Sequence, residues 1–204
     1  MKLSKIITLT ALGFGLASVG VLAGCQDDKA TSATPTEKTE TAKTTENNNA
    51  TNDATQKLPK VTVAEAIDTY QKEFPNSDIT SIELDSSFSK WYYQVEGVDD
   101  NKEYEVKIDA EKNTVKDSSD KKLDRDDQNG IKRAEDKLDL NKLASLKDVT
   151  DIALTKAEGT ATDWSLDKEL NVTYWSVTIE NGKNETEVKI NASSKEVIEI
   201  EQDN

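Results

Sequence analysis

The chain has 204 residues, enough for one or two domains, but only 34% of them are apolar, which predicts that part of it does not fold. A net charge of −14 and an isoelectric point near 4.5 argue against nucleic-acid binding, which needs basic residues to replace counterions on phosphate. Because the chain has no histidine, it has no catalytic triad, general base or zinc site that uses histidine. The one cysteine excludes an internal disulfide or a redox pair.

Residues 1–24 are typical of a signal peptide, with Lys2 and Lys5 followed by 19 uncharged residues. The sequence L-A-G-C ending at Cys25 resembles the bacterial lipobox, in which the cysteine is acylated and becomes the mature N-terminus. We therefore expect lipid, such as palmitate, on Cys25 and a protein anchored at the extracytoplasmic face of the cell membrane. Loss of the two lysines would change the charge from −14 to −16. The alternative is an uncleaved anchor, because this stretch is almost long enough to span a bilayer.

Residues 25–57 are predicted to be a disordered tether. From residue 26 onward this segment contains no Val, Ile, Leu, Met, Phe, Trp or Tyr, and nine of its 32 residues are threonine. Such a segment buries too little apolar surface to offset the entropy lost on ordering. As a flexible coil it would span about 30 Å.

The rest of the sequence contains two copies of one unit. A shift of 82 positions aligns residues 91–115 with 173–197 without a gap, and a shift of 83 aligns 62–65 with 145–148. This repeat predicts two small domains at 58–118 and 145–204, each with a charge of −7. A linker, 119–144, separates them; it is rich in charged residues but has no net charge.

Each copy is predicted to begin with a helix. Thr62 with Glu65, and Ser145 with Asp148, are capping-box patterns. Apolar residues then recur at helical spacing, and Pro75 is expected to end the first helix and Gly159 the second. The first apolar set is Val63, Ala66, Ile67, Tyr70 and Phe74, and the second is Leu146, Val149, Ile152, Ala153 and Ala157.

Alternation with period two predicts antiparallel strands after each helix, with hairpin turns at 99–101 and 181–182. The alternating residues of the first copy are Ile82 and Leu84, then Trp91, Tyr93 and Val95, then Tyr104, Val106 and Ile108, with Val115 in a short last strand. The second copy ends with Val197, Ile198 and Ile200 in the matching strand. The predicted fold is α+β, with two tandem small domains, each one helix packed on its own small antiparallel sheet.

In the linker, Ile131, Ala134 and Leu138 suggest a short amphipathic helix. The acidic run at 124–130 suggests a calcium loop, but placing Gly130 at the glycine position puts Arg125 at the first ligand position. We therefore expect a solvated linker with no specific metal site, although weak calcium binding by the acidic surface stays open.

With these elements in place, the chain resembles the PepSY family. The resemblance rests on W-Y-Y-Q-V-E at 91–96 and Y-E-V-K-I-D-A-E-K-N-T-V at 104–115, and on Y-W-S-V-T-I and T-E-V-K-I-N-A-S-S-K-E-V within 174–197. Two positions depart from the family: its turn glycine is Asn113 or Lys195 here, and its aspartate, Asp109, becomes Asn191. The resemblance implies a non-catalytic extracytoplasmic module, of the kind found in propeptides of thermolysin-like metallopeptidases and proposed to restrain peptidases.

The candidate contact residues are Tyr92 and Tyr174, which occupy equivalent positions on the strand face opposite Tyr93 and Trp175. Exposed aromatic residues at matched positions can anchor a partner. The alternative is that the two tyrosines cover each other or cap a second small core. Trp91 is predicted to pack in the core. No catalytic residue, metal ligand or cofactor is predicted.

Three classes of function are compared. A binding or regulatory lipoprotein, whose partner is an extracytoplasmic protein such as a peptidase, is favoured over an envelope peptide or small-ligand sensor or carrier. A carrier would need a concave apolar pocket, which two units of about 60 residues hardly provide. An enzyme is not predicted, because no nucleophile, base or metal-ligand set can be named.

Overall fold

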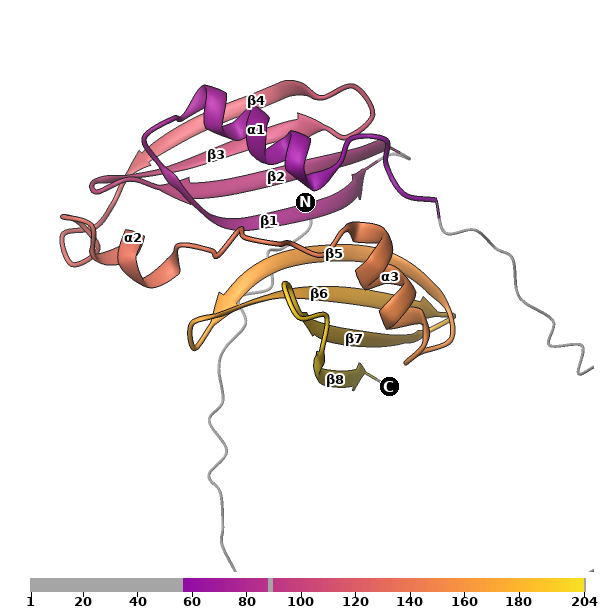
Figure 1. Cartoon of the computed structure of the whole chain (residues 1–204). Coiled ribbons are helices and arrows are strands. Elements are labelled where there is room, and N and C mark those ends of the chain that lie inside the picture. The colour runs from indigo at the N-terminus through magenta and orange to yellow at the C-terminus, as the bar shows by residue number, and fades with distance from the viewer. Residues whose placement is uncertain (1–56, 88–89, 204) are drawn as a thin grey trace, which may run out of the picture. The chain divides into compact units, whose positions relative to one another are not determined.

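The computed structural model describes residues 57–87 and 90–203 (Figure 1). The signal peptide, the lipid-attachment site Cys25 and the tether as far as residue 56 lie outside the described residues. These three expectations therefore stay predictions.

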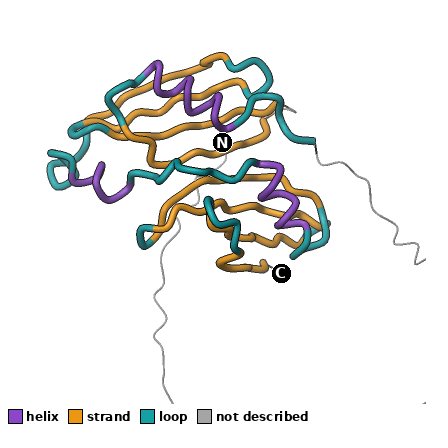
Figure 2. Tube along the Cα trace, viewed as in Figure 1, coloured by secondary structure: helices purple, strands orange, loops and turns teal. Residues whose placement is uncertain are grey.

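Both copies fold as one helix followed by four strands, as the repeat predicts (Figures 1 and 2). The first copy consists of α1 (Val63–Glu73), β1 (Asp78–Ser87), β2 (Lys90–Val98), β3 (Lys102–Asp109) and β4 (Thr114–Lys122). A short helix, α2 (Ile131–Asp136), lies between the copies. The second copy consists of α3 (Leu146–Leu154), β5 (Thr160–Glu169), β6 (Val172–Asn181), β7 (Asn184–Asn191) and β8 (Val197–Asp203).

The helix starts are confirmed in detail. The Thr62 hydroxyl accepts from the Glu65 amide, and the Glu65 carboxylate accepts from the Thr62 amide at 2.8 Å. Ser145 and Asp148 form the same reciprocal pair. The predicted end of α3 at Gly159 is wrong, because the helix ends at Leu154. Beyond it the backbone makes shorter-range hydrogen bonds, such as that from the Lys156 amide to the Ala153 carbonyl oxygen at 2.8 Å.

Gly159 lies where the chain passes close to β6, immediately before β5. Its φ is +145°, and a side chain there would place a Cβ 2.3 Å from the carbonyl oxygen of Glu180. Glycine is therefore required by a positive φ and by close approach to the neighbouring strand.

The expectation of two separate sheets is wrong. Among the described residues, eight strands form one antiparallel sheet in the order β4-β3-β2-β1-β5-β6-β7-β8. The copies join where β1 pairs with β5, through Ile82 with Leu166 and Leu84 with Trp164. Alternation indicates which side chains of a strand face the core, but it does not specify the strand that pairs with its second edge. The pairing covers two edges that would otherwise carry unpaired backbone groups.

A single apolar core extends under both helices, which lie on the same face of the sheet (Figure 1). The core includes Tyr93 and Trp175 at equivalent positions, both fully buried. Trp91 of the first copy contacts Trp164 of the second edge to face, with ring centroids 5.5 Å apart. Trp91 is therefore a packing residue, as predicted, and it packs across the junction of the two copies.

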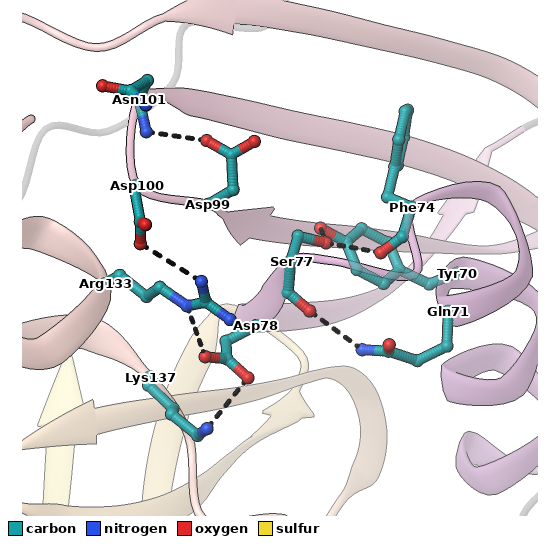
Figure 3. Close-up of polar contacts among 10 residues, drawn as sticks. All are labelled: Tyr70, Gln71, Phe74, Ser77, Asp78, Asp99, Asp100, Asn101, Arg133 and Lys137. Atoms are coloured by element: carbon teal, nitrogen blue, oxygen red, sulfur yellow. Dashed lines mark hydrogen bonds and ion pairs between the residues drawn. The ribbon is translucent and has the colours of Figure 1, made fainter. Parts of the chain in front are cut away.

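The linker packs on the first copy through charged groups at the start of β1 (Figure 3). Arg133 of α2 donates to the Asp78 carboxylate at 2.7 Å and to Asp100 at 3.1 Å, and Lys137 pairs with Asp78 at 2.9 Å. The helix is shorter than the predicted pattern, and Leu138 lies beyond its end, where it is buried. At its other end the linker segment begins in strand, because β4 continues to Lys122.

Candidate functional site

The candidate site is the face of the sheet opposite the helices, which we call the open face. Because side chains alternate along a strand, the residues between the buried ones point to this face. On β1 and β2 these are Glu83, between buried Ile82 and Leu84, and Tyr92, Gln94 and Glu96. On β5 and β6 they are Asp163, Ser165 and Asp167, with Tyr174, Ser176 and Thr178.

Both predicted contact tyrosines lie on the open face and are partly exposed. They belong to β2 and β6, which are three strand spacings apart, or about 14 Å at the usual 4.8 Å per spacing. At that separation the two rings cannot cover each other, so this alternative is not what the structure shows. The two rings therefore form two separate features of the open face.

A cation already lies over one of these rings. The Lys107 ammonium of β3 is 4.7 Å from the centroid of the Tyr92 ring, which is a cation–π distance. Tyr174 faces Asp167 across the β5–β6 pair. Loss of solvent around the Tyr174 hydroxyl, and then the charge of Asp167, raise its pKa above the ordinary value.

Carboxylates gather on the open face around the junction of the copies. Partial loss of solvent, together with the charges of Asp163, Asp167 and other acids, raises the pKa of Glu83. Loss of solvent, and then the charges of Asp85 and of acids on β6 and β7, raise the pKa of Asp163 to about 6. Burial raises the pKa of Asp167, although Ser165 donates to it at 2.7 Å. Burial and the charges of neighbouring acids also raise the pKa of Glu96 on β2. The face therefore carries concentrated negative charge that opposite charge on a partner would stabilise.

Sequence reasoning missed this carboxylate group. The acids come from three strands, β1, β2 and β5, and the two copies contribute to one group only because β1 pairs with β5. With 40 acidic residues in the chain, near-neighbour pairs carry no signal of their own. The period-two pattern places each acid on the open face, but the neighbours across the junction follow from tertiary structure.

The side chains of the open face are phenols, hydroxyls, amides and carboxylates, which donate or accept hydrogen bonds and carry negative charge. Within residues 57–87 and 90–203, no group of three or more acidic or cysteine side chains is placed to hold a metal ion. This also holds for the acidic run at 124–130, which lies within the described residues. Tyrosines, hydroxyls and carboxylates on an exposed sheet suit a polar, basic protein surface.

A second feature lies on the helix side. An apolar groove of about 540 Å³ is formed where α1 and α3 begin, with both N-caps, Thr62 and Ser145, at its border. Leucines from three segments line it: Leu58, Leu140, Leu143 and Leu146. The sequence-based argument that the two units hardly provide a concave apolar pocket is thus wrong, because the copies make one together.

Comparison with known families and structures agrees with this fold. The family PepSY, described as "Peptidase propeptide and YPEB domain", matches residues 60–112 and 144–201. A crystal structure of a proposed lipoprotein from Clostridium difficile 630 is similar, with 37% sequence identity and a TM-score of 0.70. The match covers 72% of this chain and 96% of that chain. Comparison with curated proteins gives no match. In the part of the chain that the structure describes, no helix is both long and apolar enough to cross a membrane.

Proposed function

Because the chain belongs to the PepSY family, we propose that it is a non-catalytic, lipid-anchored module that binds and regulates an extracytoplasmic protein such as a peptidase. PepSY domains are regulatory modules like those of peptidase propeptides, and they are not catalytic. Both copies of this chain match the family, so the proposal applies to nearly all of the folded part.

The observation that supports binding best is the open face. Tyr92 and Tyr174 lie on it at equivalent positions, about 14 Å apart or more, with carboxylates between them. Two matched contacts on one rigid sheet raise the effective concentration of the second contact once the first has formed. The high negative charge favours a basic partner and speeds its encounter at low salt.

The proposed location rests on the lipobox resemblance at Cys25 and on the similar protein, which is itself described as a proposed lipoprotein. The change Cys25→Ser should release the protein from the membrane fraction into the medium or leave unprocessed precursor. Fractionation of cells followed by mass spectrometry of the N-terminus measures this. Mature Cys25→Ser protein that stays attached to the membrane would contradict lipid anchoring.

The partner is identified by crosslinking in intact cells and recovery of the full chain. Affinity for the recovered partner should fall with Tyr92→Ala, fall further when Tyr174→Ala is added, and weaken with salt. Leu170→Ala is the control, because Leu170 is 89% exposed and lies in the β5–β6 turn, outside the strands that form the open face. Circular dichroism checks that the variants fold. If the tyrosine variants unfold, the rings are structural. Turnover of an envelope substrate by the pure chain would overturn the non-catalytic proposal.

The apolar groove supports a second candidate, an envelope peptide or small-ligand carrier. Its volume of about 540 Å³ is within the usual range for small-molecule sites, and leucines line it. Titration with an apolar fluorescent dye tests this, with Leu143→Asp as the blocking variant. Dye binding that is lost in Leu143→Asp, while Tyr92→Ala leaves it unchanged, would favour the carrier.

A further inference from the structure

The two outer edges of the sheet are equivalent strands of the two copies. In the strand order, β4 and β8 are the ends, and within the described residues each pairs with a strand on one side only. The register of pairing shifts at the same place in both edge pairs. The shift lies opposite Lys107 and Ile108 of β3 in the first copy, and opposite Lys189 and Ile190 of β7 in the second. The outward N–H and C=O groups of an edge strand are available to pair with another strand.

The side chains of these equivalent edges differ. On β4, Lys116 and Ser118 occupy the positions that Ile198 and Ile200 occupy on β8, and Lys121 and Lys122 follow on β4. Ile198 is 51% exposed and Ile200 is 44% exposed. Lysines on an edge oppose the addition of a further strand, whereas β8 has none. The β4 edge is therefore protected by lysines although Val115 is 40% exposed, whereas the β8 edge presents two exposed isoleucines.

The two faces of β8 have different chemistry. Ile200 pairs with buried Val188, so it lies on the helix side of the sheet, while Glu199 and Glu201 pair with Lys189 and Glu187 on the open face. One ammonium serves both carboxylates, because Lys189 Nζ is 2.8 Å from Glu199 and 3.4 Å from Glu201. A strand added beside β8 would therefore meet an apolar residue on one face and excess negative charge on the other.

We propose that β8 is a strand-addition site for an extended segment of another protein in which apolar and basic residues alternate. This inference rests on the proposed function, since it describes how a bound partner would extend the contact beyond the open face. Main-chain bonds along the edge would supply affinity, and the alternating side chains would supply specificity. The junction of β1 with β5 is the same kind of pairing within one chain.

A second copy of this chain fits β8 less well. Pairing β8 with β8 would bring Glu199, Glu201 and Asp203 of two chains together, and like charges across strands are destabilising. A basic and apolar segment has the opposite charge and the same period. The occupant is therefore a different protein.

The test uses the full chain in detergent micelles and a fluorescent synthetic peptide of alternating valine and lysine. We expect saturable binding by fluorescence anisotropy, with new protection of β8 amides from hydrogen exchange. A valine–glutamate peptide should not bind. The valine–lysine peptide with alternate N-methyl groups should bind at least about tenfold more weakly, because it keeps the side chains but loses the backbone donors. Equal binding of the N-methylated peptide would overturn strand addition.

Variants locate the site. The double change Ile198→Lys with Ile200→Lys makes β8 resemble β4 and should weaken binding by about tenfold or more, whereas Ser118→Lys on β4 should change it by less than about twofold. Glu199→Gln, which keeps the shape, should weaken binding about threefold at low salt. If only Tyr92→Ala and Tyr174→Ala weaken binding, the edge proposal fails and the proposed function stands. Self-association of the free chain that the β8 changes abolish would make the occupant a second copy and overturn the proposal.

Discussion

Glu83 and Ser165 lie opposite each other where β1 pairs with β5, and each is the counterpart of the other in the repeat. The flanking pairs follow the same rule, since Ile82 pairs with Leu166 and Leu84 with Trp164, and the shift of 82 exchanges the partners. An approximate twofold axis therefore passes between Glu83 and Ser165. The two copies pair as the subunits of a symmetric dimer would, through the same edge of each.

The charges beside this axis should make stability depend on pH. Loss of solvent and nearby acids raise the pKa of Asp163 from an ordinary 3.8 to about 6 in the folded chain, so its ionisation opposes folding. The stability that its neutral form contributes is fully present below about pH 4 and is lost as the pH rises through about 6. Asp163→Asn should stabilise the chain by about 0.5–1 kcal/mol at pH 7, a value reduced for its exposure, and should have almost no effect at pH 4. Urea unfolding at both pH values measures this.

Asp126→Asn is the control for that experiment, because Asp126 is an exposed acid of the linker. It should change the free energy of unfolding by less than about 0.5 kcal/mol at either pH. Equal stabilisation by Asp163→Asn at pH 4 and pH 7 would show that its charge is not the cause.

In the first copy the large side chain of Tyr70 on α1 packs against Gly97 on β2, and in the second copy the helix has the smaller residue and the strand the larger one. A Cβ on Gly97 would lie 2.1 Å from the Tyr70 hydroxyl oxygen and 2.6 Å from the Asp78 carbonyl oxygen. The counterparts in the second copy are Ala153 and Ile179, both buried. Gly97→Ala should therefore destabilise the chain by about 2–3 kcal/mol through overpacking, as measured by urea unfolding.

A double-mutant cycle with Tyr70→Ala checks the cause. If the two residues compete for the same space, the double variant should lose less stability than the sum of the single changes, by about 1 kcal/mol or more. Additive losses would mean that the Asp78 backbone alone excludes a side chain at position 97.

The two fully buried tryptophans of the second copy should respond differently to the same change. Trp164 Nε1 donates to the Thr150 hydroxyl at 2.9 Å, whereas Trp175 Nε1 has no hydrogen-bond partner within the described residues. Trp164→Phe and Trp175→Phe remove the same side-chain volume, but only Trp164→Phe also removes a hydrogen bond. Trp164→Phe should be the more destabilising by about 1 kcal/mol in urea unfolding. Equal losses would indicate that Trp175 gains a partner in solution, such as a buried water.

The turn before β8 carries strain that one substitution should relieve. Lys195 has a φ of +64°, and its counterpart Asn113 has a φ of +52°, a region that asparagine tolerates better than lysine. Lys195→Asn should stabilise the chain by about 0.5–1 kcal/mol in thermal or urea unfolding. Lys195→Gln is the matched control, because it keeps the strain while losing the pair with Asp148 at 3.1 Å. A gain in both variants would point to the lost charge rather than the backbone.

Local features of this protein could be predicted from the sequence because they depend on residues near one another in the chain. A capping box involves Thr62 and Glu65, three positions apart, and alternation assigns Tyr92 and Tyr93 to opposite faces of one strand. The repeat then transfers each assignment from the first copy to the second. For these reasons the helix starts, the strands and the face of both tyrosines were predictable.

The junction of the copies was decided by tertiary structure. The paired residues of β1 and β5 are 80 to 84 positions apart, and nothing in their alternation distinguishes an exposed edge from a paired one. The carboxylates around Glu83 and Asp163, and the groove between α1 and α3, exist only because this junction forms. The pairing removes two unpaired edges and joins two small cores into one, and both gains come from contacts between residues distant in the chain.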